Sequence, residues 1–230
     1  MGEFNTYKNL MPLKGYKKFL FNVYLPKEDG ETTELDVILL HESGIYVFES
    51  KNCSGWIFGS ENWQYWTQTL LSGNRDFQKY HFFNPVIQNK VHLKWLYHFL
   101  GDSELPIYSY IVFSDNCVLQ DITLTSGIHH VINSCDILDE VEENSYKAKI
   151  RLSHQEIDDL YEKIYPLTQI DKAEKSVHIE NIQQKQEQED LRCPYCGGRL
   201  VVRKSAKGRY KAEYFLGCSN YPKCRYTEEL

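Results

Sequence analysis

The sequence predicts an α/β fold in which helices flank a mixed sheet, followed by a small C-terminal module that contains four cysteines. Two apolar, β-branched runs at residues 34–40 and 44–50 indicate paired strands with both faces covered. A complete set of helix signals spans residues 84–101. Four of the seven cysteines lie within the last forty residues. With 230 residues, the chain is long enough for one domain and an appendage.

The first elements are expected to form a helix followed by a meander of strands. Residues 3–20 are predicted to be helical, and the two apolar strands come next. The polar residues 41–44 separate these strands and predict a hairpin. The aromatic and alternating segments 56–58 and 63–69 predict a third and a fourth strand.

The second half of the domain is expected to alternate helices and strands. Residues 84–101 open with an N-cap asparagine and a proline and end at a glycine, so they predict a helix. Strands are predicted at 107–113 and 131–132. A capping box at 153–156 begins a last helix, which Pro166 ends.

The composition is that of a globular protein, with 42% hydrophobic, 25% charged and 14% aromatic residues. No apolar run reaches the roughly 18–20 residues of a membrane span, and no secretory signal opens the chain. We therefore expect a cytoplasmic protein without a membrane segment in this sequence. The abrupt start at Gly2-Glu3 is compatible with an upstream segment such as an anchor. Neither a Walker A motif nor G-x-G-x-x-G occurs, so no nucleotide cofactor is expected.

Charge is distributed unevenly along the chain, whose formal net charge is −6. Residues 191–230 hold nine Lys or Arg and three Glu, a balance of +6, so residues 1–190 carry −12. A basic tail of this kind indicates a polyanionic partner. Residues 171–190 are rich in Lys, Glu and Gln and lack an apolar stripe. We therefore expect a domain over residues 1–170, a charged linker over 171–190 and the cysteine module over 191–230.

The four C-terminal cysteines have the spacing of a structural zinc site. Cys193 and Cys196 form a C-x-x-C pair, and Cys218 follows after 21 residues, with five more before Cys224. Four thiolates complete a tetrahedral Zn²⁺ shell and leave no position open for catalysis. Forty residues are too few to fold by burial alone, so a bound metal would supply the missing stability. A disulfide pair or a redox-active C-x-x-C is the alternative.

This segment resembles the zinc ribbon of type IA DNA topoisomerases, whose repeats bind single-stranded DNA. The resemblance is carried by CPYCGGRL at 193–200 and FLGCSNYPKC at 215–224. Aromatic residues interleave with basic ones, as in proteins that stack bases and neutralise phosphates, although several aromatics are also suited to the ribbon's small core. We therefore expect DNA, single-stranded or locally opened, as the partner. The candidate DNA contacts are Arg203, Lys204, Arg209, Tyr214, Phe215, Tyr221, Lys223 and Arg225.

The predicted hairpin carries two acids and a lysine that are suited to metal-dependent chemistry. A two-residue turn at Glu42-Ser43 pairs residues whose numbers add to 85, which places Asp36 opposite Glu49, with Lys51 on the same face. Opposed side chains of like charge destabilise a sheet unless a cation lies between them. Two carboxylates can hold Mg²⁺ or Mn²⁺, which activates water and polarises a phosphate, while the lysine offsets developing charge. An edge-strand salt bridge is the alternative interpretation.

Residues 2–115 resemble the NERD, or nuclease-related, domain of the PD-(D/E)xK nuclease superfamily. The matching segments are GE at 2–3, TELD at 33–36, GIYVFESKN at 44–52, NPVIQ at 84–88 and IVF at 111–113. The resemblance implies a restriction-endonuclease-like sheet with Asp36 and Glu49 as metal ligands and Lys51 as the catalytic lysine. Glu3 and Gln88 match the family's early helical glutamate and its helical glutamine, and they become accessory groups. Several NERD proteins also carry a topoisomerase-type zinc ribbon.

The two resemblances together imply a DNA nuclease, a hydrolase of phosphodiester bonds that uses Mg²⁺ or Mn²⁺ and contains one structural zinc. Its role would lie in bacterial DNA processing or defence. The main alternative is a DNA-binding adaptor that keeps the fold and the ribbon but has lost turnover. A nuclease that cleaves RNA is a third hypothesis.

Overall fold

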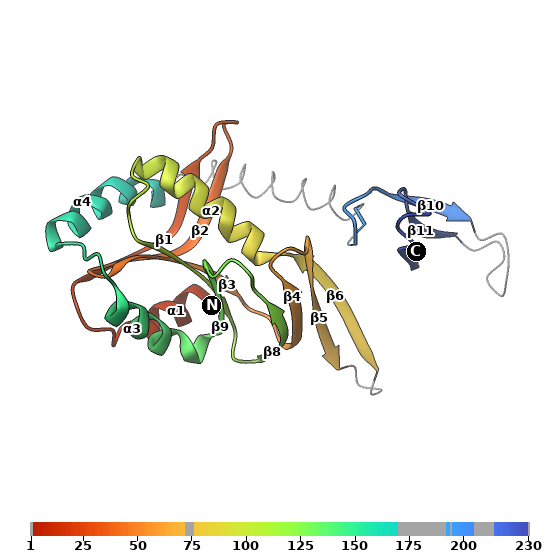
Figure 1. Cartoon of the computed structure of the whole chain (residues 1–230), viewed down its shortest axis with the longest axis horizontal. Coiled ribbons are helices and arrows are strands. Elements are labelled where there is room, and N and C mark those ends of the chain that lie inside the picture. Colours follow the sequence, from red (N-terminus) through yellow and green to blue (C-terminus); the bar gives the residue numbers. More distant parts are fainter. Residues whose placement is uncertain (1, 72–75, 170–191, 194, 205–213, 230) are drawn as a thin grey trace. The chain divides into compact units, whose positions relative to one another are not determined.

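The computed structural model describes residues 2–71, 76–169, 192–193, 195–204 and 214–229. The chain separates into two compact units, Met1–Asn62 with Trp66–Asp171 and Trp63–Tyr65 with Lys172–Leu230. Two sheets and their helices form the first unit, and a three-stranded sheet belongs to the second (Figure 1). The predicted linker over 171–190 lies outside the described residues.

The five-stranded sheet of the first unit is mixed, as the sequence predicts. Its order is β1 (Lys17–Pro26), β2 (Thr32–His41), β3 (Gly44–Lys51), β7 (Ile107–Phe113) and β9 (His129–Asn133). The first three strands are antiparallel to one another, whereas β3, β7 and β9 are parallel. Lys51 pairs with Phe113 at the carboxyl ends of β3 and β7. In open α/β sheets, this edge of the parallel strands is where ligands bind.

The prediction of one helix over residues 3–20 is wrong. Helix α1 covers only Gly2–Leu10, and β1 begins at Lys17. Pro12 cannot donate the backbone hydrogen bond that would continue the helix, and Gly15 has a left-handed φ of 102°. The aromatic and β-branched side chains between Phe19 and Tyr24 then favour a strand, which β2 completes by pairing.

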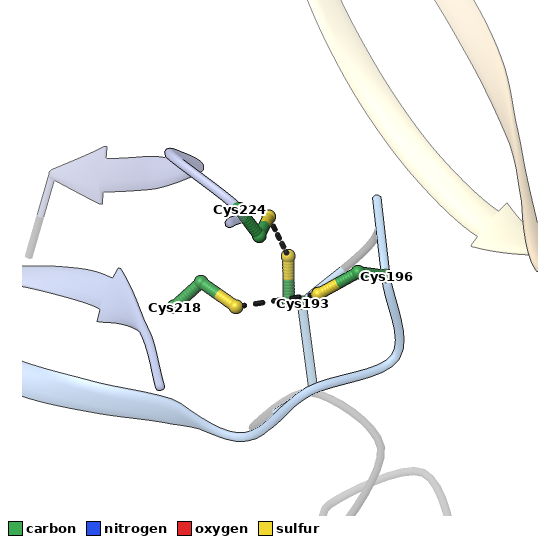
Figure 2. A group of neighbouring side chains, drawn as sticks. All are labelled: Cys193, Cys196, Cys218 and Cys224. Atoms are coloured by element: carbon green, nitrogen blue, oxygen red, sulfur yellow. Dashed lines mark hydrogen bonds between the residues drawn. The ribbon is translucent and has the colours of Figure 1, made fainter. Parts of the chain in front are cut away.

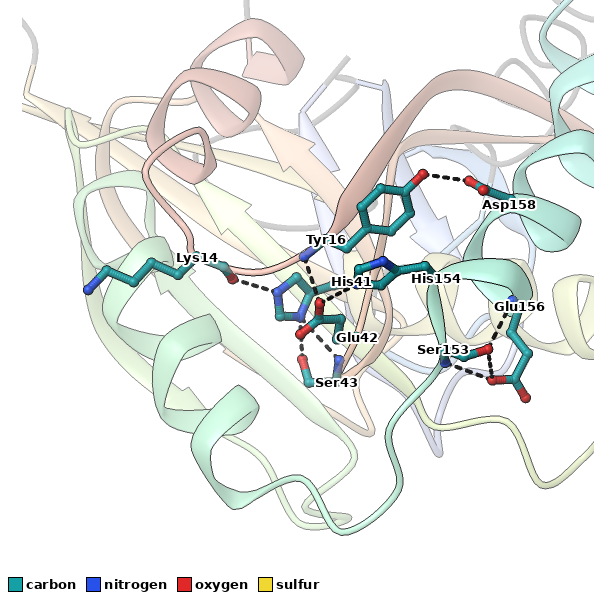
Figure 3. A network of polar contacts seen from close by, with 9 residues as sticks. All are labelled: Lys14, Tyr16, His41, Glu42, Ser43, Ser153, His154, Glu156 and Asp158. Atoms are coloured by element: carbon teal, nitrogen blue, oxygen red, sulfur yellow. Dashed lines mark hydrogen bonds and ion pairs between the residues drawn. The ribbon is translucent and has the colours of Figure 1, made fainter.

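The β2–β3 hairpin has the predicted register. His41 pairs with Gly44 and Val37 with Phe48, so the numbers of paired residues add to 85. A buried polar network holds the turn (Figure 3). The His41 Nδ1 atom lies 2.7 Å from Ser43 Oγ, and its Nε2 atom lies 2.8 Å from the carbonyl oxygen of Lys14. A slip of one residue would break these contacts, so the network supports the register.

The same turn is also tied to two distant segments through Glu42 (Figure 3). Its carboxylate accepts a hydrogen bond from the backbone N–H of Tyr16 at 3.0 Å and faces His154 Nε2 at 3.0 Å. These bonds, led by that of Tyr16, lower the pKa of Glu42. Its carbonyl oxygen accepts from the Leu152 N–H at 2.7 Å. The turn is thereby joined to the segment before β1 and to the start of α4 (His154–Ile164).

Helices cover both faces of the mixed sheet, as its apolar strands predict (Figure 1). Helices α2 (Pro85–Leu100) and α4 pack on one face, where Val47 joins Leu96 and Ile157 in one core. Helices α1 and α3 (Ile137–Lys147) pack on the other face, where Phe48 joins Leu10 and Ile137. Helix α3 was not predicted, although Ile137 and Val141 have the spacing of a buried helical stripe.

The two helices with clear sequence signals begin and end as predicted. The Asn84 side chain accepts from the Val86 N–H at 2.9 Å, and Gly101 closes α2 with a φ of 75°. Ser153 and Glu156 form the capping box of α4. A short 3₁₀ turn, η2 (Tyr165–Thr168), contains Pro166 and follows α4 directly. A second 3₁₀ turn, η1 (Ser134–Asp136), precedes α3.

The predicted strands at 56–58 and 63–69 belong to a separate four-stranded sheet. Its order is β6 (Phe77–Phe83), β5 (Tyr65–Leu71), β4 (Gly55–Ser60) and β8 (Cys117–Thr123). The buried Trp66 ring lies over Gly59, where an added Cβ would come within 2.1 Å of the ring. Strands β6 and β8 were missed because most of their side chains are exposed and lack a clear apolar face.

The second unit contains the antiparallel strands β10 (Leu200–Lys204), β11 (Tyr214–Cys218) and β12 (Thr227–Glu229). Its small core is formed by Cys193, Leu200 and Cys218. Of the helices in the described residues, none has the length and apolar character needed to cross a membrane.

Candidate active site and metal centre

Glu49 is a buried carboxylate near the end of β3, with 3% of the residue exposed. Its Oε1 atom accepts a hydrogen bond from Lys51 Nζ at 2.6 Å, and its Oε2 atom lies 3.2 Å from His92 Nε2. Burial raises the pKa of Glu49, but the hydrogen bond from His92 and the charge of Lys51 outweigh it and hold the pKa below its usual value. The surroundings therefore favour an ionised Glu49.

Lys51 joins Glu49 to helix α2. It follows Glu49 by two residues, so both side chains leave the same face of β3, the face covered by α2. Its ammonium group also donates to Gln88 Oε1 at 3.0 Å. The structure thus brings together Glu49, Lys51 and Gln88, three of the five residues predicted for the nuclease site.

Asp36 lies beside this group at the end of the β2–β3 ladder. Val37–Phe48 is the last pair in that ladder, and the Asp36 Oδ2 atom accepts from the Ser50 N–H at 2.8 Å. Burial, followed by the negative charge of Glu49, raises the pKa of Asp36 to about 7. Burial is the larger cause, and the charge of Glu49 adds to it in the direction that two neighbouring acids predict. Glu3 of α1 also contributes negative charge to Asp36.

At Asp36, the regular alternation of side chains between the two faces of β2 is interrupted. The sequence pattern does not reveal this interruption. Leu35 packs into the core under α2 and Val37 into the core under α1, although alternate residues of a regular strand share a face. Opposite them, Asn22 has a φ of 49°, and it lies between the pairs Phe21–Val37 and Val23–Leu35. Asp36 consequently sits at a local twist between the two faces rather than in a regular ladder.

The Asp36 and Glu49 pair suits a hard divalent cation. Both offer carboxylate oxygens, and a cation would relieve the repulsion that raises the pKa of Asp36. Mg²⁺ commonly uses one or two carboxylates and completes its shell with water. Within the described ranges, neither acid belongs to a group of three or more metal-ligating side chains whose donor atoms all lie within 4.8 Å of one another. If these two carboxylates held Mg²⁺ or Mn²⁺, water would have to supply most of the remaining ligands.

Two residues of this site, His92 and Thr33, were not predicted from the sequence. His92 contacts Glu49 from α2, and its Nδ1 atom lies 2.7 Å from Thr33 Oγ1. His92 is 43 positions from Glu49 and 59 positions from Thr33 in the chain, so no local pattern indicates these contacts. The available signal was the position of His92, four residues after Gln88 and hence on the same side of the helix.

A polar cavity of about 210 Å³ opens next to Lys51 at the carboxyl ends of β3 and β7. Hydroxyl and amide side chains from α1, from the end of β3 and the residue after it, and from the segment after β7 provide half of its lining residues. They include Asn5, Thr6, Ser50, Asn52, Ser114 and Asn116. Lys51 therefore lies on the boundary between the carboxylate pair and a hydrogen-bonding recess.

The four C-terminal cysteines converge as predicted (Figure 2). Their sulfur atoms all lie within 4.8 Å of one another, with 3.3 Å between Cys196 and Cys218 and 3.5 Å between Cys193 and Cys224. These separations exceed the bond length of about 2.05 Å in a disulfide. They are close to the roughly 3.8 Å between sulfurs around tetrahedral zinc with Zn–S bonds of 2.3 Å.

Local hydrogen bonds lower the pKa of one of these thiols, Cys196, whereas burial raises the pKa of Cys193 and Cys218. Asn220 donates from its backbone N–H to Cys218 Sγ and from its side chain to Cys196 Sγ, each at 3.4 Å. The hydrogen bond from the Gly198 backbone, with those of Cys218 and Asn220, lowers the pKa of Cys196 to about 6. Zinc binds the thiolate form, so the cluster fits a structural Zn²⁺.

The predicted DNA contacts are only partly described. Arg209 lies outside the described residues, and only the backbone of Lys204 and Tyr214 is described. An open cavity of about 560 Å³ is lined by Arg203, Phe215, Tyr221 and Arg225. The Arg203 guanidinium lies 5.8 Å from the centre of the Tyr221 ring, and 61% of Tyr221 is exposed. Lys223 is exposed but is not part of this lining.

Comparisons with known proteins identify both parts of the chain. The nuclease-related domain matches residues 1–114, and the topoisomerase DNA binding C4 zinc finger matches residues 190–230. An uncharacterized protein of Bacillus anthracis is 32% identical over 166 residues, which cover 72% of this chain and 74% of that protein. No solved structure matches the chain.

The zinc module has relatives in much longer proteins. DNA topoisomerase 1 of Methanocaldococcus jannaschii is 62% identical over 43 residues, or 19% of this chain and 5% of the topoisomerase. DNA topoisomerase 1 of Archaeoglobus fulgidus is 56% identical over 39 residues, or 17% of this chain and 5% of that protein. The similarity to these enzymes is therefore confined to the C-terminal module.

Proposed function

Since the chain belongs to the family of proteins with a nuclease-related domain, here followed by a topoisomerase-type C4 zinc ribbon, we propose that it is a metal-dependent deoxyribonuclease. The observation that carries this proposal is the contact of Lys51 with both Glu49 and Gln88. The raised pKa of the neighbouring Asp36 supports it. These are the residues that the nuclease motif requires, and they come from three different elements.

The residues divide the chemistry among themselves in this proposal. Asp36 and Glu49 hold Mg²⁺ or Mn²⁺, which would supply an activated water and neutralise charge on the phosphate. Lys51 provides a positive charge for the phosphate oxygens as negative charge develops during cleavage. Gln88 accepts from the Lys51 ammonium and so fixes its direction. Glu3 supplements the acidic side of the site from α1.

The ribbon supplies DNA affinity in this proposal and takes no part in cleavage. Its closed set of four cysteines leaves no ligand position for water or substrate. Exposed Tyr221 offers a face for base stacking, and Arg203 and Arg225 offer charge for phosphates. This arrangement favours single-stranded or locally opened DNA. Because zinc-binding thiols persist in reducing compartments, we place the activity in the cytoplasm, in DNA processing or defence.

A cleavage assay with matched variants tests the enzyme. Zinc-loaded protein is incubated with single- and double-stranded DNA over a series of Mg²⁺ and Mn²⁺ concentrations. Lys51→Ala is expected to reduce cleavage by ~10²-fold or more, the scale of losing one transition-state donor. Lys90→Ala, on the exposed side of the same helix, is the control and should cleave normally. Cleavage by Lys51→Ala at the rate of the unmodified protein would exclude the proposed site.

A non-catalytic DNA-binding adaptor is the second candidate. It is favoured by the 2.6 Å ion pair of Lys51 with Glu49, which is also what a purely structural salt bridge would form. An adaptor would bind DNA through its ribbon and show no metal-dependent cleavage of either DNA or RNA. Cleavage of RNA but not of DNA would instead support the hypothesis of a ribonuclease.

A further inference from the structure

One face of α2 contacts both Glu49 and Lys51, the two charged residues of the E-x-K motif in β3. Gln88 and His92 are four residues apart, a spacing that places two side chains next to each other on a helix. Gln88 accepts from Lys51, and His92 contacts Glu49. The geometry of the motif is therefore set by a helix that is far from β3 in the sequence.

His92 is itself held from a third element. It is 4% exposed, and its Nδ1 atom lies 2.7 Å from the hydroxyl of Thr33, which is 8% exposed. Because a carboxylate only accepts hydrogen bonds, the bond to Glu49 places a hydrogen on His92 Nε2. The hydroxyl at Nδ1 then fixes the orientation of the ring, since both nitrogens have a defined partner. Thr33 lies in β2, three residues before Asp36.

We propose that His92 is a positioning residue for the metal-binding carboxylate of Glu49, and that Thr33 acts through it. This inference rests on the proposed function. Glu49 Oε1 is directed by Lys51 and Oε2 by His92, so the two bonds fix the plane and the reach of the carboxylate. Such outer partners orient metal ligands, and their loss typically weakens metal affinity by about 10–100-fold.

The chain of contacts also relates the two carboxylates to each other. Thr33 and Asp36 share β2, whereas Glu49 belongs to β3 and His92 to α2. The ladder between β2 and β3 ends at Val37–Phe48, before the two acids. Beyond that last pair, the Thr33–His92–Glu49 contacts connect β2 and β3 through side chains. They hold Glu49 in place relative to the strand that carries Asp36.

The test measures Mn²⁺ affinity of the full zinc-loaded chain by titration calorimetry, together with thermal unfolding. His92→Leu removes both ring contacts and should weaken Mn²⁺ binding by about 10–100-fold. His92→Gln can place an amide N–H near the position of Nε2 and should recover most of the affinity. Thr33→Val should weaken binding, and it should add nothing further in a His92→Leu background because Thr33 acts through the ring. His98→Gln is the matched control, since its side chain is 64% exposed on the same helix.

A second measurement separates positioning from substrate contact. His92 is buried, so at saturating Mn²⁺ its variants should change KM for DNA little, while cleavage by His92→Leu stays slower than normal. Normal Mn²⁺ affinity in His92→Leu would overturn the inference. If that variant unfolds below the assay temperature, Thr33→Val decides, and normal affinity there would have the same consequence.

The unmodified protein is measured first, so that failure of the proposed function can be distinguished from failure of the inference. If it binds no Mn²⁺ beyond its zinc, the proposed metal-dependent function and the inference both fall. If it binds Mn²⁺ without cleaving DNA, the nuclease proposal falls, and the affinities of the His92 variants still decide the inference.

Discussion

At the scale of single residues, Asp36 and Glu49 come from one hairpin but have different electrostatic surroundings. Glu49 has a cationic partner in Lys51 and a hydrogen-bond donor in His92, and its pKa is lowered. Asp36 accepts a hydrogen bond from the Ser50 N–H at 2.8 Å. Burial, together with the charge of Glu49, raises the pKa of Asp36 to about 7. The repulsion between opposed acids predicts that neutralising either Asp36 or Glu49 leaves the metal-free fold equally or more stable. The structure limits that expectation to Asp36.

Asp36→Asn should therefore stabilise the metal-free protein while it removes metal binding. The amide keeps an oxygen for the Ser50 N–H and carries no charge to be repelled. At pH 8 the melting temperature should rise by several degrees, because each kcal/mol is worth roughly 2–4 °C in a protein of this size. Mn²⁺ binding should be lost, because the charged carboxylate that would hold the cation is replaced by a neutral amide. Asp76→Asn is an exposed control. A destabilised Asp36→Asn protein with normal Mn²⁺ binding would show that Asp36 has a structural role only.

At the scale of elements, the site depends on how hairpin, helix and loop are anchored. The hairpin register decides which side chains of β3 meet α2, and the network of His41 and Ser43 holds that register at the turn. A comparable anchor holds the end of β4. Glu61 Oε2 accepts from the backbone N–H groups of Thr125 and Ser126 at 2.6 and 2.8 Å, and so closes the loop after β8. Hydrogen bonds from Ser126 and Thr125 lower its pKa to about 2.

Glu61→Gln should show a pH-dependent loss of stability. The folded-state pKa lies below the usual value of roughly 4.3, so the stabilisation is complete above that pH and disappears as pH falls towards 2. The variant should melt roughly 2–4 °C lower at pH 7, the effect of about 1 kcal/mol at a partly exposed site. The difference should shrink near pH 3. Glu104→Gln, an exposed acid in another loop, serves as the control. An equal difference at both pH values would assign the loss to packing rather than to charge.

At the scale of the whole molecule, charge and metal chemistry are divided between the two parts. Residues 1–190 carry −12 and residues 191–230 carry +6. Zinc with four thiolates contributes about −2 to the ribbon, which remains basic. An acidic body gives little general attraction for DNA, so binding should depend on the ribbon.

One zinc per chain is expected, held by the four C-terminal cysteines. Because the sulfur atoms already lie within 4.8 Å of one another, loss of one ligand should abolish tight binding. Metal analysis of the purified protein should give one equivalent of zinc, and Cys196→Ser should give much less. Cys53→Ser, in the body, is the control and should keep its zinc. Equal zinc contents in the Cys196→Ser and unmodified proteins would disprove this ligand set.

Affinity for single-stranded DNA should weaken with salt, and the ribbon's arginines should set the slope. Removing one phosphate contact with Arg225→Gln should lower the slope of log affinity against log salt by about 0.7. Tyr221→Ala should weaken binding at every salt concentration without changing the slope, since stacking releases no counterions. Lys149→Gln, an exposed site in the body, is the control. An unchanged slope in Arg225→Gln would remove that residue from the interface.

The sequence by itself determined those features that depend on local spacing or on a nearby turn. Cysteine spacing indicated the zinc cluster, capping residues indicated α2 and α4, and a two-residue turn fixed the register of the β2–β3 hairpin. The spacing of two residues placed Glu49 and Lys51 on one face of β3. The resemblance to the nuclease-related domain implied Gln88 as a site residue, but only the tertiary structure decided how it meets Lys51 and that His92 lies beside it. Gln88 and His92 contact Lys51 and Glu49 because α2 packs on β3. Asp36 lies outside the regular β2–β3 ladder, at the level where Asn22 of the neighbouring strand has a left-handed φ. Contacts between distant segments depend on packing and burial, which act through space, whereas a sequence pattern records only neighbours along the chain.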